Sequence, residues 1–232
     1  MAIDKNGTIE YNLTRTSRKN VNITVKNDGV IYVSAPKRVA LADINKIVLS
    51  KRDWIINAQK NVKARKVIKN DIILRNNSSV RLYGTQRKLL LVPCMKNFVA
   101  LNDDTIVFYV KEDYSDDQKY KNNIFNKFLK TELQETVNKF AFKYLKMLNL
   151  SLDTIEFRAM KSRWGTCIPA KKKILFNTKL IHCPIEAIEY VVLHEIVHLI
   201  HPNHSNAFYT TVGVYMPDWK ERKKILQDYL IQ

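Results

Sequence analysis

The five histidines of this chain all lie between residues 182 and 204, and two of them belong to the motif His194-Glu195-Ile196-Val197-His198. The motif lies in an apolar run, at about residues 185–201, that is typical of a buried helix. Pro184 favours a helix start at this point, because proline needs no partner for its missing N–H group. Side chains four residues apart share one face of a helix, so the motif predicts that its two histidines point towards a single site.

The residues after the motif can complete a metal site. Pro202 cannot continue the helix and Asn203 tolerates left-handed backbone geometry, so the chain can turn back and bring His204 to the same point. Zinc in hydrolases usually takes three protein ligands and keeps a fourth position for water. We therefore predict one zinc ion per chain, bound by His194, His198 and His204. The motif also arises by chance, so the competing interpretation is a histidine that hydrogen-bonds within the core.

Glu195 follows the first of these histidines and lies about 100° further round the helix, beside the expected metal. A carboxylate at this place can take a proton from a zinc-bound water, whose pKa zinc lowers to about 7, and can deliver it to the leaving group. Glu195 is therefore the predicted general base. We expect His201 to be exposed at the turn and His182 to be a polar residue at the end of a strand. The candidates for contacts to substrate or for stabilising a developing oxyanion are Arg163, Tyr190, Tyr209 and Tyr215.

Composition excludes several other classes of protein. The N-terminal residues MAIDKNGTIEYNL contain no apolar core of a secretory signal. The longest apolar stretch, AIEYVVLHEIVHLI, is too short for a bilayer span and is broken by histidine and glutamate. The three cysteines, Cys94, Cys167 and Cys183, are far apart, which argues against a disulfide framework and against a cysteine-type zinc site. We therefore expect a cytoplasmic protein that has no membrane segment.

The apolar pattern predicts an α+β fold with a β-rich N-terminal region over residues 1–115 and a second domain over residues 116–232. Strands are expected at residues 8–15, 20–27 and 30–36, with a hairpin turn at Asp28-Gly29, and two strand pairs are expected at residues 80–93 and 98–111. One helix is predicted from about residue 41 to residue 63. Its expected apolar stripe consists of Ile44, Ile47, Val48, Trp54, Ile55 and Ala58.

The second domain is predicted to be mainly helical around a short strand region. The polar and acidic residues 111–119 favour a linker or an exposed loop. Apolar residues then recur at helical spacing and predict a long amphipathic helix over residues 121–148. The remaining expected elements are strands at 154–160 and 172–180 on either side of a turn-like segment at 162–171, the helix that carries the motif, and a last helix at about 217–230.

Several segments together resemble the YgjP-like metallopeptidase family, a relative of the SprT-like zincins. The segments are RAMKSRWGTC (158–167), ILFN (174–177), Leu180, Pro184, YVVLHEIVHLIHPNHSNAFY (190–209) and MPDW (216–219), and residues 30–55 are similar to the N-terminal portion of the family. The resemblance implies a zincin-like metallohydrolase domain with ligands at His194, His198 and His204 and a catalytic glutamate at Glu195. Thr166 stands where the family commonly has serine.

The segment around RWGTC has two interpretations. It can be an edge strand beside the cleft that pairs with an extended peptide, with Arg163 binding the substrate. Alternatively it can serve packing, with Trp164 in the core, Gly165 allowing a close approach and Cys167 acting as a small buried side chain.

Three hypotheses for the function follow. The first is a zinc metallopeptidase that acts on a peptide or protein. The second is a zinc-dependent hydrolase of nucleotide phosphoanhydrides at the same site, with basic side chains that neutralise the phosphates. The third is a DNA-associated protein with a structural zinc.

The charge of the chain bears on the second and third hypotheses. The chain has a net charge of +17, and residues 1–75 carry 16 basic and 6 acidic side chains. The basic segment at residues 49–70 predicts either a surface for nucleic acid or nucleotides or a solvated, lysine-rich helix face.

Overall fold

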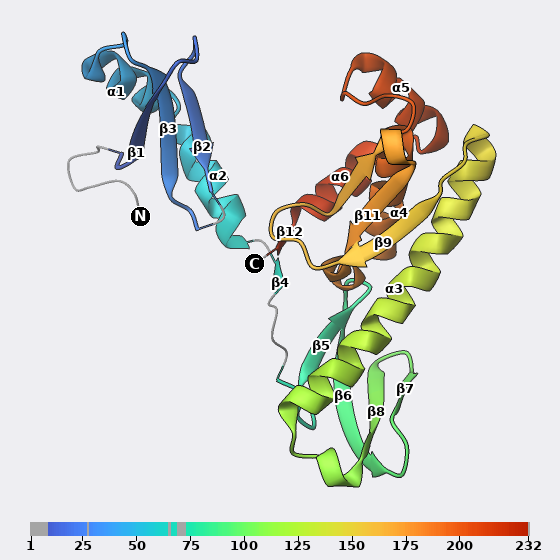
Figure 1. Cartoon of the computed structure of the whole chain (residues 1–232). Coiled ribbons are helices and arrows are strands. Elements are labelled where there is room, and N and C mark those ends of the chain that lie inside the picture. Colours follow the sequence, from blue (N-terminus) through green and yellow to red (C-terminus); the bar gives the residue numbers. More distant parts are fainter. Residues whose placement is uncertain (1–8, 27, 65, 69–72, 232) are drawn as a thin grey trace. The chain divides into compact units, whose positions relative to one another are not determined.

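The computed structural model describes residues 9–26, 28–64, 66–68 and 73–231 and divides the chain into two units (Figure 1). The first unit is Met1–Lys66 and the second is Val67–Gln232, and each has its own apolar core. The boundary expected after residue 115 falls inside the second unit, because the strands before it and the helix after it bury their side chains in one shared core.

The first unit contains a three-stranded sheet with two helices. The strands are β1 (Asn12–Thr16), β2 (Asn22–Val25) and β3 (Ile31–Pro36), in the order β1-β3-β2. The expected turn at Asp28-Gly29 is confirmed, because β2 and β3 are antiparallel and Gly29 has a φ of +81°, a conformation that glycine adopts without strain. Residue 8 of the first predicted strand and residue 27 lie outside the described residues.

The single helix expected at residues 41–63 is two helices, α1 (Leu41–Ser50) and α2 (Arg52–Ala64), which meet at Lys51. The predicted apolar stripe is also too wide. Ile44 and Val48 are buried, whereas Trp54 is 50% exposed because the adjacent Ile55 takes the buried position instead. Ile47, also part of the predicted stripe, is exposed. Residues 65, 69 and 70 of the basic segment lie outside the described residues.

The second unit begins with a four-stranded sheet. Its strands are β5 (Ser79–Leu82), β6 (Thr85–Cys94), β7 (Phe98–Leu101) and β8 (Thr105–Lys111), in the order β5-β6-β8-β7. Both predicted strand pairs are confirmed as antiparallel hairpins. Tyr83 and Gly84, which form the first turn, both have positive φ, as the tight turns that suit twisted hairpins require. Residues 111–119 are mostly exposed, with one helical turn, η1 (Glu112–Tyr114).

The long helix α3 (Gln118–Leu148) confirms the predicted amphipathic helix and begins three residues earlier. Its first turn is capped by the Asp117 side chain, which accepts a hydrogen bond from the Tyr120 N–H at 2.9 Å. In Figure 1 this helix runs past both sheets of the second unit. Its buried face contributes to their common core, mainly through Phe125, Leu129, Leu133, Val137, Ala141 and Tyr144.

The second sheet of this unit contains β9 (Thr154–Arg158), β10 (Gly165–Ile168) and β11 (Lys173–Asn177) in the order β10-β11-β9. The predicted strands correspond to β9 and β11, which are parallel. The segment expected to be turn-like is not a simple turn, because its residues 165–168 form β10, an edge strand antiparallel to β11. A short helical turn, η2 (Pro169–Lys171), joins β10 to β11.

Helices that follow β11 complete the second unit. They are η3 (Thr178–His182), α4 (Ile185–Val197), α5 (Asn206–Tyr215) and α6 (Trp219–Gln227). Two short strands, β4 (Lys66–Ile68) and β12 (Tyr229–Ile231), pair in a two-stranded sheet. The helix with the motif is α4, which ends at Val197 and not near residue 201, and α5 was not expected. Within the described residues, no helix is long and apolar enough to span a membrane.

Candidate metal centre and active site

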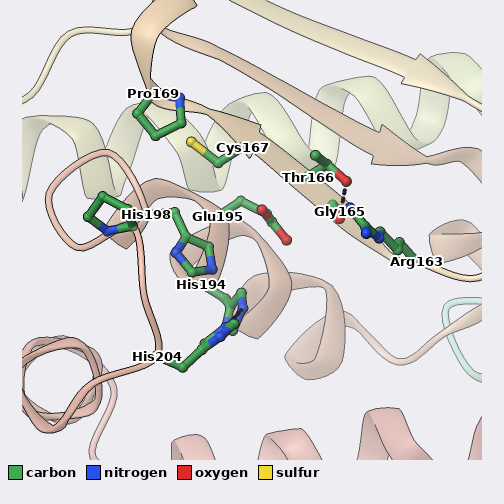
Figure 2. Close-up of a pocket in the computed structure, with 10 residues that line it drawn as sticks. Arg163, Gly165, Thr166, Cys167, Pro169, His194, Glu195, His198 and His204 are labelled. Carbon is green, nitrogen blue, oxygen red and sulfur yellow. Dashed lines mark hydrogen bonds between the residues drawn. The ribbon is translucent and has the colours of Figure 1, made fainter. Parts of the chain in front are cut away.

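Three histidines from the end of α4 and the turn that follows it converge on one point (Figure 2). His194 lies in the last turn of α4, His198 is the residue that ends this helix, and His204 lies just before α5. One ring nitrogen from each histidine lies within 4.8 Å of the other two. The Nε2 atoms of His194 and His204 are 2.9 Å apart. The turn predicted after Pro202 therefore does bring the third histidine back to the first two.

Contacts on the far side of two of the rings fix which nitrogen faces this point. The Nδ1 of His194 is 3.4 Å from the Tyr190 hydroxyl, and the Nδ1 of His198 lies 2.9 Å from the His201 carbonyl oxygen, to which it can donate. A hydrogen bond at one ring nitrogen sets the tautomer and leaves the other nitrogen to bind a metal. In both rings the nitrogen left to bind is Nε2.

The donor set fits a zinc ion. Zinc binds imidazole nitrogens at about 2.0–2.1 Å in a tetrahedron, which places neighbouring ligand atoms about 3.3 Å apart. The distances between the three nitrogens, from 2.9 Å to at most 4.8 Å, bracket this value. Burial, followed by the charges of His198, His204 and Lys223, lowers the pKa of His194 to about 3. The ring is therefore neutral near neutral pH, which is the form that binds a metal.

Glu195 is buried beside the histidines and lies against the edge strand β10. Its side chain is held there by the backbone N–H of Cys167, which donates to the carboxyl group. Burial raises the pKa of Glu195 to about 7, although the Cys167 hydrogen bond and the Arg163 charge both act to lower it. A carboxyl group with this proton affinity can both accept and release a proton near neutral pH.

Gly165 leaves the space that Glu195 occupies. A Cβ atom at this position would lie 2.6 Å from the Oε1 atom and 2.6 Å from the Cγ atom of Glu195. Real Cβ atoms essentially never come so close to other heavy atoms, so a larger residue would have to displace the carboxyl group. The close approach proposed for Gly165 from the sequence is thus made to the carboxyl group of Glu195.

A pocket of about 330 Å³ lies over the three histidines and Glu195. One wall is β10 with the residues on either side of it, and the other is the end of α4 with the turn that follows (Figure 2). Desolvation and the nearby Glu195 raise the pKa of the Cys167 thiol to about 11, so the thiol is protonated at neutral pH. The residues that line the pocket are Arg163, Gly165, Thr166, Cys167, Pro169, His194, Glu195, His198, Pro202 and His204.

The candidate contact residues are divided between the pocket and its surroundings. Arg163 lines the pocket, whereas Tyr190, Tyr209 and Tyr215 do not. Tyr190 is buried behind His194, and Tyr209 stacks on Trp219 with ring centroids 4.9 Å apart.

Two histidines have other surroundings than expected. His201 is half-buried and not exposed, because its Nε2 bonds to the Thr211 hydroxyl at 3.1 Å. His182 ends the short helix η3 and not a strand. It is buried, with its Nδ1 2.6 Å from the Arg81 carbonyl oxygen.

Asn177 is a site residue that the sequence pattern did not reveal. Its side chain is wholly buried at the end of β11, and its Nδ2 donates to the carbonyl oxygens of Met160 and Arg163, each at 2.8 Å. It thereby fixes the loop that leads into β10. The sequence contains one sign of this role, which is a single amide side chain at the end of a very apolar strand. A polar group that is buried in such a place must have hydrogen-bond partners.

A partly buried network holds α4 from behind. Glu189 accepts hydrogen bonds from Lys143 and Tyr144 of α3, both at 2.8 Å, and from Arg222 of α6 at 2.5 Å. Burial alone would raise the pKa of Glu189, but these hydrogen bonds outweigh it and hold the pKa below its ordinary value of 4.5. The network ties the helix that carries the histidine motif to helices on two sides.

Comparisons with known proteins find a matching family model and similar solved structures. A family model described as YgjP-like, metallopeptidase domain, matches residues 19–229. Among solved structures, the metallopeptidase zymogen abylysin of Pyrococcus abyssi is 20% identical, with 38% of this chain and 87% of that chain covered and a TM-score of 0.35. The zymogen jannalysin of Methanocaldococcus jannaschii is 23% identical, with 39% and 88% covered and a TM-score of 0.36. No curated protein matches the chain.

Proposed function

The chain belongs to the YgjP-like metallopeptidase family, as its motifs indicated, and from this premise we propose that it is a zinc-dependent peptidase of zincin-like fold. The observation that carries the proposal is the convergence of three histidine nitrogens within 4.8 Å beside a buried carboxyl group. In this proposal His194, His198 and His204 hold the zinc ion and leave a fourth position for water or substrate. When bound, zinc acts as a Lewis acid that lowers the pKa of a water to about 7.

Glu195 is the proposed general base. Its carboxyl group takes a proton from the attacking water and transfers it to the nitrogen of the leaving amine. The hydrogen bond from the Cys167 N–H and the close contact at Gly165 support this role, because they fix the carboxyl group at the wall of the pocket. A base that is held in place needs no rearrangement before it acts.

The edge strand β10 is the proposed binding surface for the peptide backbone. Within the described residues it pairs with β11 on one side only, and its residues Gly165, Thr166 and Cys167 line the pocket. Sheet edges commonly bind extended peptides by adding them as a further strand. A peptide bound in this way lies across the histidines and Glu195, where a bond can be cleaved.

The two alternatives for the function have less support. A nucleoside triphosphate carries several negative charges, whereas Arg163 is the one lysine or arginine among the residues that line the described pocket. Structural zinc sites are usually closed by four protein ligands, whereas the described cluster has three histidines. Nucleotide hydrolysis and a structural zinc both remain outcomes that the following experiment can detect.

The test combines metal analysis with matched variants. Purified protein should contain about one zinc per chain, and His204→Ala should lose it, while Asn203→Ala next to it should not. Glu195→Gln should keep the zinc and the fold but lower cleavage of an unfolded protein by at least about a hundredfold. Glu186→Gln, an exposed glutamate on the same helix, is the control.

Each result has a distinct consequence. Retention of zinc by His204→Ala would contradict the ligand set, and full activity of Glu195→Gln would remove Glu195 as the base. Hydrolysis of nucleoside triphosphates without cleavage of any protein would support the second hypothesis in place of the peptidase.

A further inference from the structure

Arg163 stands at one end of the pocket with its side chain exposed. Within the described part of the chain, its guanidinium group takes part in no hydrogen bond or salt bridge, although its charge acts on the Glu195 carboxyl through space. An arginine fork of this kind can bind a planar carboxylate through two parallel hydrogen bonds. The group is therefore placed to bind an anionic part of a ligand in the pocket.

The position of Arg163 is fixed by the backbone that carries it. The wholly buried Asn177 donates to the Arg163 carbonyl oxygen and to the Met160 carbonyl oxygen, each at 2.8 Å. Trp164, the next residue, packs against the core of the second unit. These contacts make the loop before β10 a rigid support, which lowers the entropy lost when a ligand binds.

The charges in the pocket favour an anionic ligand. Glu195 is the one acidic side chain among the residues that line it, and that carboxyl group is buried in the wall against β10. Arg163 is exposed, so a carboxylate can reach it without first displacing an internal ion pair. A site whose accessible charge has one sign attracts ligands of the opposite sign.

The direction of the strand indicates which part of a peptide reaches Arg163. Arg163 precedes Gly165, the first residue of β10, so it stands at the N-terminal end of this strand (Figure 2). A peptide that pairs with β10 in the antiparallel sense, which has the more stable hydrogen-bond pattern, runs the opposite way. The C-terminal part of such a peptide therefore lies at Arg163.

We propose that the pocket selects peptides that carry a carboxylate on the C-terminal side of the cleaved bond, and that Arg163 binds this carboxylate. The inference rests on the proposed function, because it assumes a peptide that lies along β10. The carboxylate is either the free C-terminus of the peptide or the side chain of an aspartate or glutamate. Arg163 is then the residue that determines specificity, separate from the groups that take part in the reaction.

Binding to an inactive protein tests the proposal without relying on cleavage. The zinc-loaded full chain with Glu195→Gln is titrated into fluorescein-labelled pentaalanine peptides that end in a free carboxylate or in a carboxamide. A second pair, tetraalanine extended by glutamate amide or by glutamine amide, separates a side-chain carboxylate from a free C-terminus. The carboxylate member of at least one pair should bind about tenfold more tightly, as a charge-assisted pair with arginine implies.

Variants of the loop before β10 identify the residue that binds the carboxylate. Arg163→Gln in the same background should reduce the preference to less than about twofold, and Arg163→Lys should keep part of it, because lysine keeps the charge but loses the fork. Lys161→Gln removes an exposed charge from the same loop outside the pocket and should keep the full preference. A preference that persists in Arg163→Gln would assign the carboxylate to the zinc ion and would overturn the proposal.

Cleavage by the wild-type protein tests the direction. Where the side-chain pair shows the preference, mass spectrometry of the products from peptides with one glutamate should show bonds cut on the N-terminal side of that residue, and cuts only on its C-terminal side would overturn the proposed orientation. Where only the free C-terminus is preferred, the cuts should lie near the C-terminus, and cuts that are unaffected by its amidation would overturn it. If the wild-type protein cleaves no peptide, the proposed function fails, whereas the binding preference and its dependence on Arg163 are still measured independently.

Discussion

Gly165 and Glu195 show how a single missing side chain can leave room for a buried carboxyl group. Because a Cβ at residue 165 would lie 2.6 Å from the Glu195 Oε1, we predict that Gly165→Ala displaces the carboxyl group while the histidines keep their places. A displacement of about 1 Å can reduce a rate a hundredfold, so kcat should fall by roughly tenfold to a hundredfold. The zinc content should stay at that of the wild type, which metal analysis of the same sample checks.

A second glycine provides the control for this substitution. A Cβ at Gly213 of α5 would lie 3.6 Å from the Trp219 Nε1, which is ordinary contact, so Gly213→Ala should leave kcat unchanged. Equal activity of Gly165→Ala and the wild-type protein would show that activity does not require the Glu195 carboxyl group at its present position.

Tyr190 contacts His194, one of the three proposed zinc ligands. Its hydroxyl lies 3.4 Å from the His194 Nδ1, and a contact of this kind can orient a ligand ring. We predict that Tyr190→Phe lowers the affinity for zinc by about tenfold, at the low end of the effects of such supporting contacts. Competition with a chelator measures this affinity, and an unchanged value would show that α4 alone orients the ring.

At the scale of single residues, the sequence predicts those side chains whose role follows from their spacing along the chain. The two histidines of the motif are four residues apart on a helix, and the breaker at Pro202 shows where the third can return. The role of Asn177 and the half-buried state of His201 were not predictable, because each depends on a carbonyl or hydroxyl group from a distant segment. Spacing along the chain contains no information about such partners.

Glu189 is the point at which α3, α4 and α6 are joined. Because its pKa is held below the ordinary value of 4.5, its ionised form stabilises the folded state above that pH. This contribution is lost as the pH falls from about 4.5 through the lowered pKa in the folded state, where the carboxyl group takes up a proton. Stability should therefore decline with acid in this range, as measured by urea unfolding at a series of pH values.

Glu189→Gln isolates this contribution. The variant should be less stable at neutral pH by about 1–3 kcal/mol, because Lys143 loses its carboxylate partner and Arg222 keeps only Asp218. Its stability should also depend less on pH below about 4.5. Glu186→Gln, which changes an exposed glutamate of the same helix, should keep the wild-type pH profile. An identical profile for Glu189→Gln would mean that other carboxylates dominate acid unfolding.

Elements with strong periodicity were predictable, whereas short elements were not. The apolar–polar alternation in β1 to β3 and the helical repeat of α3 lie within single segments, so the sequence alone indicates them. The strand β10 has four residues and exists because it pairs with β11, and the helix α5 is marked mainly by its cap at Ser205. The break between α1 and α2 at Lys51 involves neither proline nor glycine, so the local sequence does not indicate it.

At the scale of the whole molecule, composition was a poor guide to where one unit ends. The acidic residues 111–119 suggested a boundary, but a polar loop on the surface of one unit has the same composition as a linker between two. The division near residue 66 follows from which side chains share a core, and this becomes visible only when β8 and α3 are seen to bury their side chains together.

Separate cores imply that the second unit keeps its site without the first. The two apolar clusters have no residue in common, and the proposed ligands and Glu195 all belong to the second unit. We predict that a chain that begins at Lys66, so that β4 is retained, folds cooperatively, binds one zinc ion and cleaves short peptides with a kcat/KM within about threefold of the full chain.

The same truncation separates the chemistry from the basic charge. Residues 1–65 carry 13 of the 39 lysines and arginines, so affinity for DNA, if the full chain has any, should fall steeply with salt and should be largely lost when these residues are removed. The measurement is fluorescence anisotropy of a labelled duplex at several salt concentrations, with peptide hydrolysis assayed on the same samples. Loss of zinc and of hydrolysis together with the first unit would contradict the independence of the site.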